Sequence, residues 1–111
     1  MSHYAEYRAE RENAIVIEDE NGFASAIPFG DYYYIDEIYV IPEKRKSNIA
    51  STYAKKHEKI AKHKGYEYIL GSVDPKANGS TISLKVLLAY GFELLEIGQN
   101  GLIYLTKKIG E

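Results

Sequence analysis

Three consecutive cations, Lys44, Arg45 and Lys46, are the side chains of this sequence whose chemistry is easiest to recognise. They stand between Pro42 and a segment, 47–64, whose apolar residues recur with a helical period. The first turn of a helix has backbone N–H groups without partners, and the helix dipole adds positive potential there. The sequence therefore predicts an anion site at the start of this helix, suited to a phosphate or a pyrophosphate.

The charge distribution favours one local anion site over a general affinity for nucleic acids. The formal net charge is −2, yet residues 42–65 hold eight Lys or Arg against two acids, so this block carries +6 and the rest of the chain −8. Lys55, Lys59 and Lys62 lie opposite the apolar stripe of the predicted helix and are expected to form a solvated face. The acidic total charge disfavours a nucleic-acid binder.

The elements that must position this site follow from the sequence pattern. Strands are predicted at 13–19, 22–29, 31–41, 66–73, 92–98 and 102–108, and helices at 3–12, 47–64 and 80–90. Asn-Gly pairs at 21–22 and 100–101 predict hairpin turns, and Gly65 and Gly91 are expected to end two helices. The order predicts one α+β domain over residues 1–111, with a mixed sheet, one right-handed parallel crossover and covering helices.

The longest predicted strand changes its hydrophobic phase in the middle. Tyr33 and Ile35 alternate in one phase, whereas Ile38 and Val40 alternate in the other. A β-bulge at residues 36–37 would reconcile the two phases, and bulges re-aim side chains next to active sites. The alternative is a single unbroken phase through the strand, without a bulge.

Composition excludes several kinds of chemistry. The chain has no Cys, which rules out disulfides, thiolate zinc sites and Cys nucleophiles. His3, His57 and His63 are too scattered to suggest a metal site, and His57, within an apolar stripe, is expected to be a buried, hydrogen-bonded core histidine rather than a catalytic one. No apolar run approaches the length of a membrane helix and no signal peptide is recognised, so a cytoplasmic protein is expected. Eleven Tyr and no Trp are unusual, but they do not indicate a function.

The segment 38–50, IYVIPEKRKSNIA, resembles the acetyl-CoA signature of the GNAT N-acetyltransferase superfamily. That signature is a strand ending in Val-x-Pro, followed by Arg/Gln-x-x-Gly-x-Gly/Ala at the start of a helix. The strand at 66–73 and the helix ending in LAYGF at 88–92 resemble the family's second motif. The resemblance covers residues 32–108. It implies a GNAT-like fold, which is a mixed, mostly antiparallel sheet with a central parallel crossover and helices on both faces. It also implies an acetyl-CoA-dependent N-acetyltransferase that acts on a primary amine by direct attack on the thioester.

The resemblance also implies roles for individual residues. The pantetheine arm of acetyl-CoA would pair with the strand backbone, and the pyrophosphate would lie on the amides of the following turn. The cofactor-binding candidates are Ile38, Tyr39, Val40, Arg45, Lys46, Ser47, Asn48, Ile49 and Ala50, together with Ser80, the expected N-cap of the last helix. The Val40 backbone N–H would stabilise the oxyanion, and Glu37 and Asp36 are the candidates for the general base, acting through a water.

Two positions depart from the family pattern. Asn48 stands where the family has its first Gly, and Leu87 stands where it often has a Tyr that protonates the departing thiolate. Tyr90 and Ser83 are alternative proton donors, although a thiolate can leave without one because thiols have a pKa of about 8.5. These departures leave open an alternative function, a non-catalytic CoA-binding or interaction module on the same fold.

Family members usually begin with a strand and one or two helices that are not recognised here, since only residues 1–12 precede the first predicted strand. We therefore expect an uncovered sheet edge at 14–18 and an incomplete acceptor wall, because the resemblance implies that N-terminal elements and the last strands enclose the acceptor. A second subunit, docking through that edge or through Leu84 and Leu88, would fill the gap. The acceptor itself is not identified, although the acidic remainder of the chain favours a cationic one.

Overall fold

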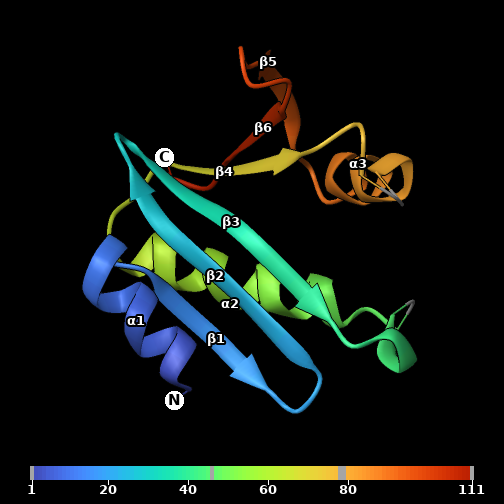
Figure 1. The fold of residues 1–111 in the computed structure, drawn as a ribbon. Coiled ribbons are helices and arrows are strands. Elements are labelled where there is room, and N and C mark those ends of the chain that lie inside the picture. The colour runs from blue at the N-terminus through green and yellow to red at the C-terminus, as the bar shows by residue number, and fades with distance from the viewer. Residues whose placement is uncertain (1, 46, 78–79, 111) are drawn as a thin grey trace.

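A mixed sheet with the strand order β1-β2-β3-β4-β6-β5 forms the framework of the molecule (Figure 1). The computed structural model describes residues 2–45, 47–77 and 80–110, and the side chains of all of these except 80–83. The strands are β1 Ile15–Asp19, β2 Gly22–Phe29, β3 Tyr32–Val40, β4 Tyr68–Val73, β5 Glu93–Ile97 and β6 Ile103–Lys108. The helices are α1 His3–Glu12, α2 Ile49–His63 and α3 Ser80–Ala89, with a 3-10 turn, η1, at Pro42–Lys44.

The predicted connections are confirmed. The pairs β1–β2, β2–β3 and β5–β6 are antiparallel, and β3 and β4 are parallel neighbours joined through α2. Helix α2 begins two residues later than predicted because Asn48 adopts a left-handed conformation. Strand β4 also begins two residues later than predicted, because Gly65 has φ +89° and Tyr66 still donates to the Ala61 carbonyl at 3.0 Å.

Helices cover both faces of the sheet, as predicted (Figure 1). On one face, α2 and α3 pack on a core that contains Tyr33, Ile69 and Leu105. On the other face, α1 places Tyr4 against Phe23, with ring centroids 5.6 Å apart. Because successive strand residues point to opposite faces, Phe23 faces α1, whereas the next residue, Ala24, is buried beneath α2. Within the described residues, no helix has the length and apolarity needed to span a membrane.

The N-terminal helix forms for local reasons. Ser2 caps it by accepting a hydrogen bond from the Ala5 amide at 3.1 Å, and Asn13 ends it with φ +56°. Ala5 and Arg8 are its buried residues. The sequence predicts this helix only from its charged residues, whereas in the structure Ala5 and Arg8, about one turn apart, attach it to the sheet.

His57 is the buried core histidine that the sequence predicts. Its side chain is fully buried, with Nε2 2.8 Å from the Ala24 carbonyl and Nδ1 2.7 Å from the Tyr33 hydroxyl. Since a carbonyl only accepts, Nε2 carries the proton and Nδ1 accepts from Tyr33. Burial lowers the pKa of His57, so the ring is neutral in the folded chain.

This burial predicts a loss of stability in mild acid. The unfolded chain takes up the His57 proton more readily than the folded one, so the free energy of unfolding should fall as the pH drops below about 6.5, by up to about 1.4 kcal/mol per pH unit. Urea unfolding at pH 7.5 and 5.5 measures the drop. It should be smaller in His57→Gln and unchanged in His63→Gln, which alters an exposed histidine. Equal drops in both variants would contradict the assignment.

Candidate functional site

Strands β3 and β4 pair only at their beginnings. The parallel register runs from Tyr32↔Tyr68 to Tyr34↔Leu70. Beyond that point β3 stays paired with β2 up to Val40, and β4 stays paired with β6 up to Val73. The two strands separate in Figure 1, and their facing edges run on without pairing to each other. A substrate with amide groups could use these backbone groups as hydrogen-bonding partners.

The bulge predicted at 36–37 is confirmed, and the unbroken phase is wrong. Ser25 pairs with Glu37 and Ala26 with Ile35, so Asp36 is the extra residue. Tyr33 and Ile35 are buried before the bulge, and Val40 is buried after it. The bulge turns Ile38 and Val40 onto the face that the helical crossover covers.

The bulged strand directs backbone groups toward the open edge. Ile41 donates its N–H to the Asn21 carbonyl at 2.8 Å, on the β2 side. Because backbone groups alternate along a strand, the Val40 N–H and C=O point away from β2, to the side that β4 has left. The Val40 carbonyl accepts a 2.8 Å hydrogen bond from Arg45 Nε. The candidate oxyanion donor, the Val40 N–H, thus faces the edge where no strand pairs with it.

Asn48 keeps the backbone conformation that the family's Gly permits. Its φ is +64° and ψ +15°, in the left-handed region, where Asn is one of the best tolerated residues after Gly. Its side chain makes no capping hydrogen bond, so it does not occupy the first amides of α2. Asn48 therefore adopts a turn that Gly would also allow, and the first amides of α2, including those of Ile49 and Ala50, have no side-chain cap from it.

This conformation predicts different effects on stability for two substitutions of Asn48. Asn48→Gly should leave the free energy of unfolding unchanged or slightly raise it, whereas Asn48→Val should lower it by about 1–2 kcal/mol, because a Cβ-branched residue is strained at positive φ. Urea unfolding checks both. The control Lys55→Val, on the exposed face of α2, should cost only about 0.5 kcal/mol. A harmless Asn48→Val would contradict the assigned turn.

Two of the three cations of the predicted anion site, Lys44 and Arg45, lie between the end of β3 and the start of α2. The Arg45 guanidinium lies 5.6 Å from the centroid of the Tyr39 ring, and Lys44 is exposed beside it. Ser47 donates its hydroxyl to the Lys44 carbonyl. Lys46 lies outside the described residues. Ile38 and Tyr39 are each 43% exposed, so large side chains of the bulged strand remain accessible next to these charges.

Arg8 of α1 contacts this site, although no pattern in the sequence indicates it. It is only 5% exposed, and its guanidinium contacts both bulge carboxylates, with Nη2 2.6 Å from Asp36 and Nη1 bonded to Glu37. It also pairs with Glu12 at 2.8 Å and donates to the Ser25 hydroxyl at 3.1 Å. Nothing in a single sequence links position 8 to position 36, since 28 residues separate them.

This ion-pair cluster defines how the two carboxylates are held. Ser25 donates to Asp36 at 2.9 Å, and the Tyr4 hydroxyl donates to Glu37, which raises the pKa of Tyr4. Burial acts against the charge of Arg8, but its hydrogen bonds with Tyr4 and Asp36 outweigh burial and raise its pKa. The carboxylates are therefore fixed at the bulge, with oxygens engaged by a permanent cation.

The candidates on α3 are placed less favourably. The backbone of Ser80 and Ser83 is helical, but their side chains lie outside the described residues. Tyr90 packs 6.1 Å from Phe92, and the Lys107 ammonium lies 4.0 Å from its ring centroid. In the β4–β6 ladder, Lys107 lies opposite Ile69, near the beginning of β4. The part of β4 that does not pair with β3 is at the other end of the strand. Burial raises the pKa of Tyr90, and its surroundings favour a packing role.

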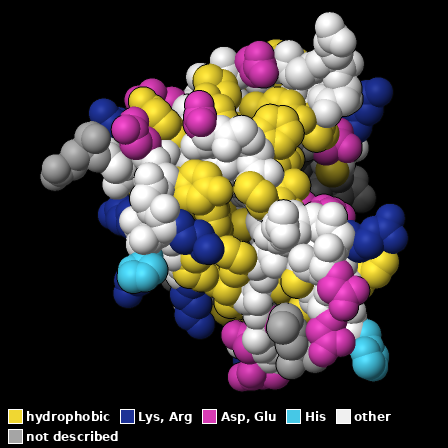
Figure 2. Space-filling view, turned by 90° about the vertical axis from the view of Figure 1, so that its left-hand side faces the viewer, with side chains coloured by type: hydrophobic (Ala, Val, Ile, Leu, Met, Phe, Trp, Pro, Cys, Tyr) yellow, Lys and Arg dark blue, Asp and Glu magenta, His cyan; other side chains and the backbone are white. Residues whose placement is uncertain are grey.

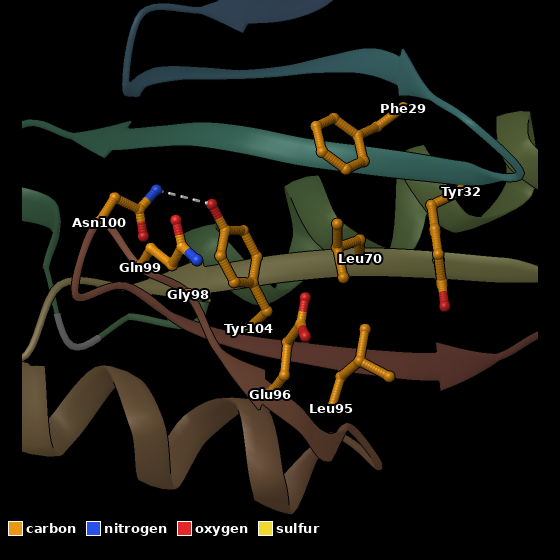
Figure 3. A pocket seen from close by; sticks show the side chains of 9 residues that line it. All are labelled: Phe29, Tyr32, Leu70, Leu95, Glu96, Gly98, Gln99, Asn100 and Tyr104. Carbon is orange, nitrogen blue, oxygen red and sulfur yellow. Dashed lines mark hydrogen bonds between the residues drawn. The ribbon is translucent and has the colours of Figure 1, made fainter.

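A hollow of about 660 Å³ opens on the sheet face that α2 and α3 do not cover (Figure 3). Side chains from β2, β3, β4, β5 and β6 meet there, together with the β5–β6 loop. The lining residues are Phe29, Tyr32, Leu70, Leu95, Glu96, Gly98, Gln99, Asn100 and Tyr104. Figure 2 shows the side of the molecule on which the β2–β3 turn lies, where hydrophobic side chains form a band bordered by charged ones. The hollow is therefore a second candidate ligand site, on the face that α1 only partly covers.

Comparison with protein families identifies the fold and its lineage. Residues 2–92 match the model of the Acetyltransferase (GNAT) family. The chain belongs to the GNAT family. This match confirms the resemblance seen in the signature at 38–50, and the mixed sheet with its single parallel pair is the fold expected for a GNAT domain. No curated protein matches the chain in sequence.

Solved GNAT structures share this fold at low sequence identity. PaiA N-acetyltransferase from Thermoplasma acidophilum, in complex with coenzyme A, is similar with a TM-score of 0.74 and 19% identity, over 92% of this chain and 65% of that one. A GNAT family acetyltransferase from Elizabethkingia anophelis with acetyl-CoA bound gives 0.73 and 18%, over 97% and 83%. An aminoglycoside 6'-N-acetyltransferase complexed with coenzyme A gives 0.72 and 18%, over 88% and 73%. This chain thus spans about two thirds of the PaiA chain.

Proposed function

We propose that this GNAT protein is an acetyl-CoA-dependent N-acetyltransferase that transfers the acetyl group to a primary amine. The observation that carries the proposal is the open edge of β3, which lies next to the uncapped start of α2 in a chain of the GNAT family. Solved relatives of the same fold are complexes with coenzyme A or acetyl-CoA, which supports the choice of co-substrate.

The residues at this edge fit such a ligand. The backbone of Ile38 and Val40 would pair with the amides of the pantetheine arm, since it points away from β2. The pyrophosphate would lie on the amides of Ser47 to Ala50 at the start of α2, with Arg45 and Lys46 as counter-charges. Ser80 would contribute from the start of α3.

The reaction needs few groups from the protein. Acetyl-CoA supplies a thioester whose carbonyl the neutral amine attacks directly. The Val40 N–H would donate to the oxygen as it gains negative charge. Glu37 or Asp36, held by Arg8, would take the ammonium proton through a water that bridges to the amine. We do not assign Ser83 or Tyr90 a role, because a thiolate leaves readily without an acid.

Two measurements with the 111-residue chain test the proposal. Isothermal titration should detect acetyl-CoA binding at micromolar to millimolar concentration, and a thiol-reactive dye should report CoA release that depends on an added primary amine. Absence of acetyl-CoA binding at millimolar concentration would refute the proposal.

The alternative is a non-catalytic CoA-binding module on the same fold. One observation favours it: a buried arginine engages both carboxylates that could serve as the base. This alternative predicts that CoA and acetyl-CoA bind equally well and that no amine accelerates CoA release. Amine-dependent release that is lost in Glu37→Gln would exclude it.

We also propose that two copies of the chain associate. The predicted edge position of β1 is confirmed, and Leu88 of α3 is 49% exposed, whereas Leu84 packs on the core. Either surface could bury apolar or backbone groups against a second copy. Light scattering at micromolar concentration should give twice the mass of 12.6 kDa, and Leu88→Lys should shift it toward the monomer if α3 forms the contact. A monomer at all concentrations would contradict the proposal. The cytoplasmic location expected from the sequence stays a prediction.

A further inference from the structure

Aromatic rings collect on the open face of the sheet. Tyr34 lies 5.7 Å from Phe29 and 6.2 Å from Tyr104, measured between ring centroids, and Tyr32 lies 6.0 Å from Tyr68. Tyr32 and Tyr34 alternate along β3 with the buried Tyr33, so they point to the face opposite α2. These five rings include four of the eleven tyrosines, and the proposed reaction assigns no role to these four.

Three of these rings, Phe29, Tyr32 and Tyr104, line the hollow, which leaves apolar surface in contact with water. Phe29 is 53% exposed and Leu95 42% exposed, although both line the same concavity. Apolar groups gathered in one exposed hollow mark a binding site more often than isolated ones do. Its volume of about 660 Å³ accommodates a small molecule of one or two rings.

Among the described residues that line the hollow, Glu96 is the only charged one. In Figure 3 its carboxylate lies between Leu95 and the ring of Tyr104. Asn100 Nδ2 donates to the Tyr104 hydroxyl at 3.0 Å, which fixes the orientation of this ring at the end of the hollow nearest the β5–β6 loop. The remaining polar partners, Gln99 and Asn100, are neutral amides.

We infer that this hollow binds a primary amine with a single positive charge and a flat aromatic body. The inference rests on the proposed function, since it names the acceptor of that reaction. An ammonium group gains from one carboxylate and from the faces of aromatic rings, and an aromatic body gains from ring-to-ring contacts. A polycation would bring further ammonium groups over apolar surface, because the described residues that line the hollow include no second carboxylate, and these ammonium groups would lose their hydration.

A panel of four amines tests this class. 2-Phenylethylamine, 2-cyclohexylethylamine, spermidine and kanamycin are titrated into the full chain, with and without acetyl-CoA. 2-Phenylethylamine should bind about fivefold more tightly than its cyclohexyl analogue, because the two share charge and length but not the aromatic ring. It should also bind more tightly than the two polycations. Preference for spermidine or kanamycin, or equal affinity for the ring and its saturated analogue, would overturn the inference.

Variants assign the contacts. Glu96→Gln should weaken 2-phenylethylamine binding about fivefold, and Tyr104→Leu should remove the preference over the cyclohexyl analogue. The matched control Glu93→Gln changes an exposed carboxylate of the same strand that does not line the hollow, and should have no effect. Equal affinity in wild type and Glu96→Gln would refute the carboxylate's role.

Failure of the acceptor inference and failure of the proposed function are distinguishable. Amine binding is measured without acetyl-CoA, so it decides the class of ligand even if no acetyl group is transferred. Conversely, if acetyl groups were transferred only to spermidine or kanamycin, the proposed N-acetyltransferase function would hold. The inference that the acceptor is an aromatic amine would then be overturned.

Discussion

Replacing Arg8 by Met should lower the free energy of unfolding by about 3 kcal/mol, the largest effect we expect from a single substitution. The methionine keeps the apolar length of the side chain but removes the cation between Asp36, Glu37 and Glu12. Asp36 is only 16% exposed, so its charge would be left without a partner in a poorly hydrated place. Glu37 and Glu12 are 44% exposed and can regain water, which keeps the loss below that of a fully buried cluster. Urea unfolding at pH 7.5 measures it.

Two further variants show whether the effect belongs to the cluster. Arg11→Met removes an exposed arginine of the same helix and should cost less than about 0.5 kcal/mol. Arg8→Lys keeps the charge but not the planar fork that reaches two carboxylates, so it should recover only part of the loss. A cost of Arg8→Met no larger than that of Arg11→Met would show that the cluster does not stabilise the fold.

Replacing Arg45 by Glu should weaken acetyl-CoA binding at least tenfold. The change reverses a charge at the start of α2 and removes the guanidinium that donates to the Val40 carbonyl. A negative side chain there repels phosphates and opposes the positive end of the helix. Isothermal titration at 50 and 200 mM salt measures the affinity, and the difference between wild type and variant should narrow at the higher salt.

Lys59→Glu is the matched control for this charge reversal. It changes the net charge equally on an exposed turn of the same helix, far along the chain from its first turn. Its acetyl-CoA affinity should remain within about twofold of wild type. If both variants lose affinity equally, the attraction comes from the overall charge of α2 and no phosphate site lies at residue 45.

Local patterns were sufficient to predict the framework of this protein. The Asn-Gly turns, the helical stripe of α2 and the order of the strands together predict a crossover with hairpins on either side, and the phase change in β3 predicts the bulge. These features are encoded within a few neighbouring residues, where side-chain alternation and turn preference act directly. The resemblance at 38–50 added the family and its co-substrate.

The missing parts of the prediction depend on contacts between distant segments. In the sequence, Arg8 is one of several charged residues on a polar helix. Only the packing of α1 on the sheet brings it to the bulge. The aromatic lining of the hollow is a similar case, since Phe29, Tyr32 and Tyr104 come from three strands that meet only in the sheet. Asn48 departs from the motif in sequence, but its φ of +64° is a conformation that Gly also adopts readily.

The contact between Arg8 and the bulge has a consequence for cooperativity. Local unfolding of α1 would remove the cation that holds Asp36 and Glu37. The free energy of unfolding α1 is therefore coupled to the free energy of ordering the bulge. By thermodynamic linkage, a ligand that requires the ordered bulge must then protect the α1 amides from hydrogen exchange, and a fully docked α1 must strengthen that ligand's binding by the same factor. The first ten residues of the protein are thus coupled to a site that lies near residue 40.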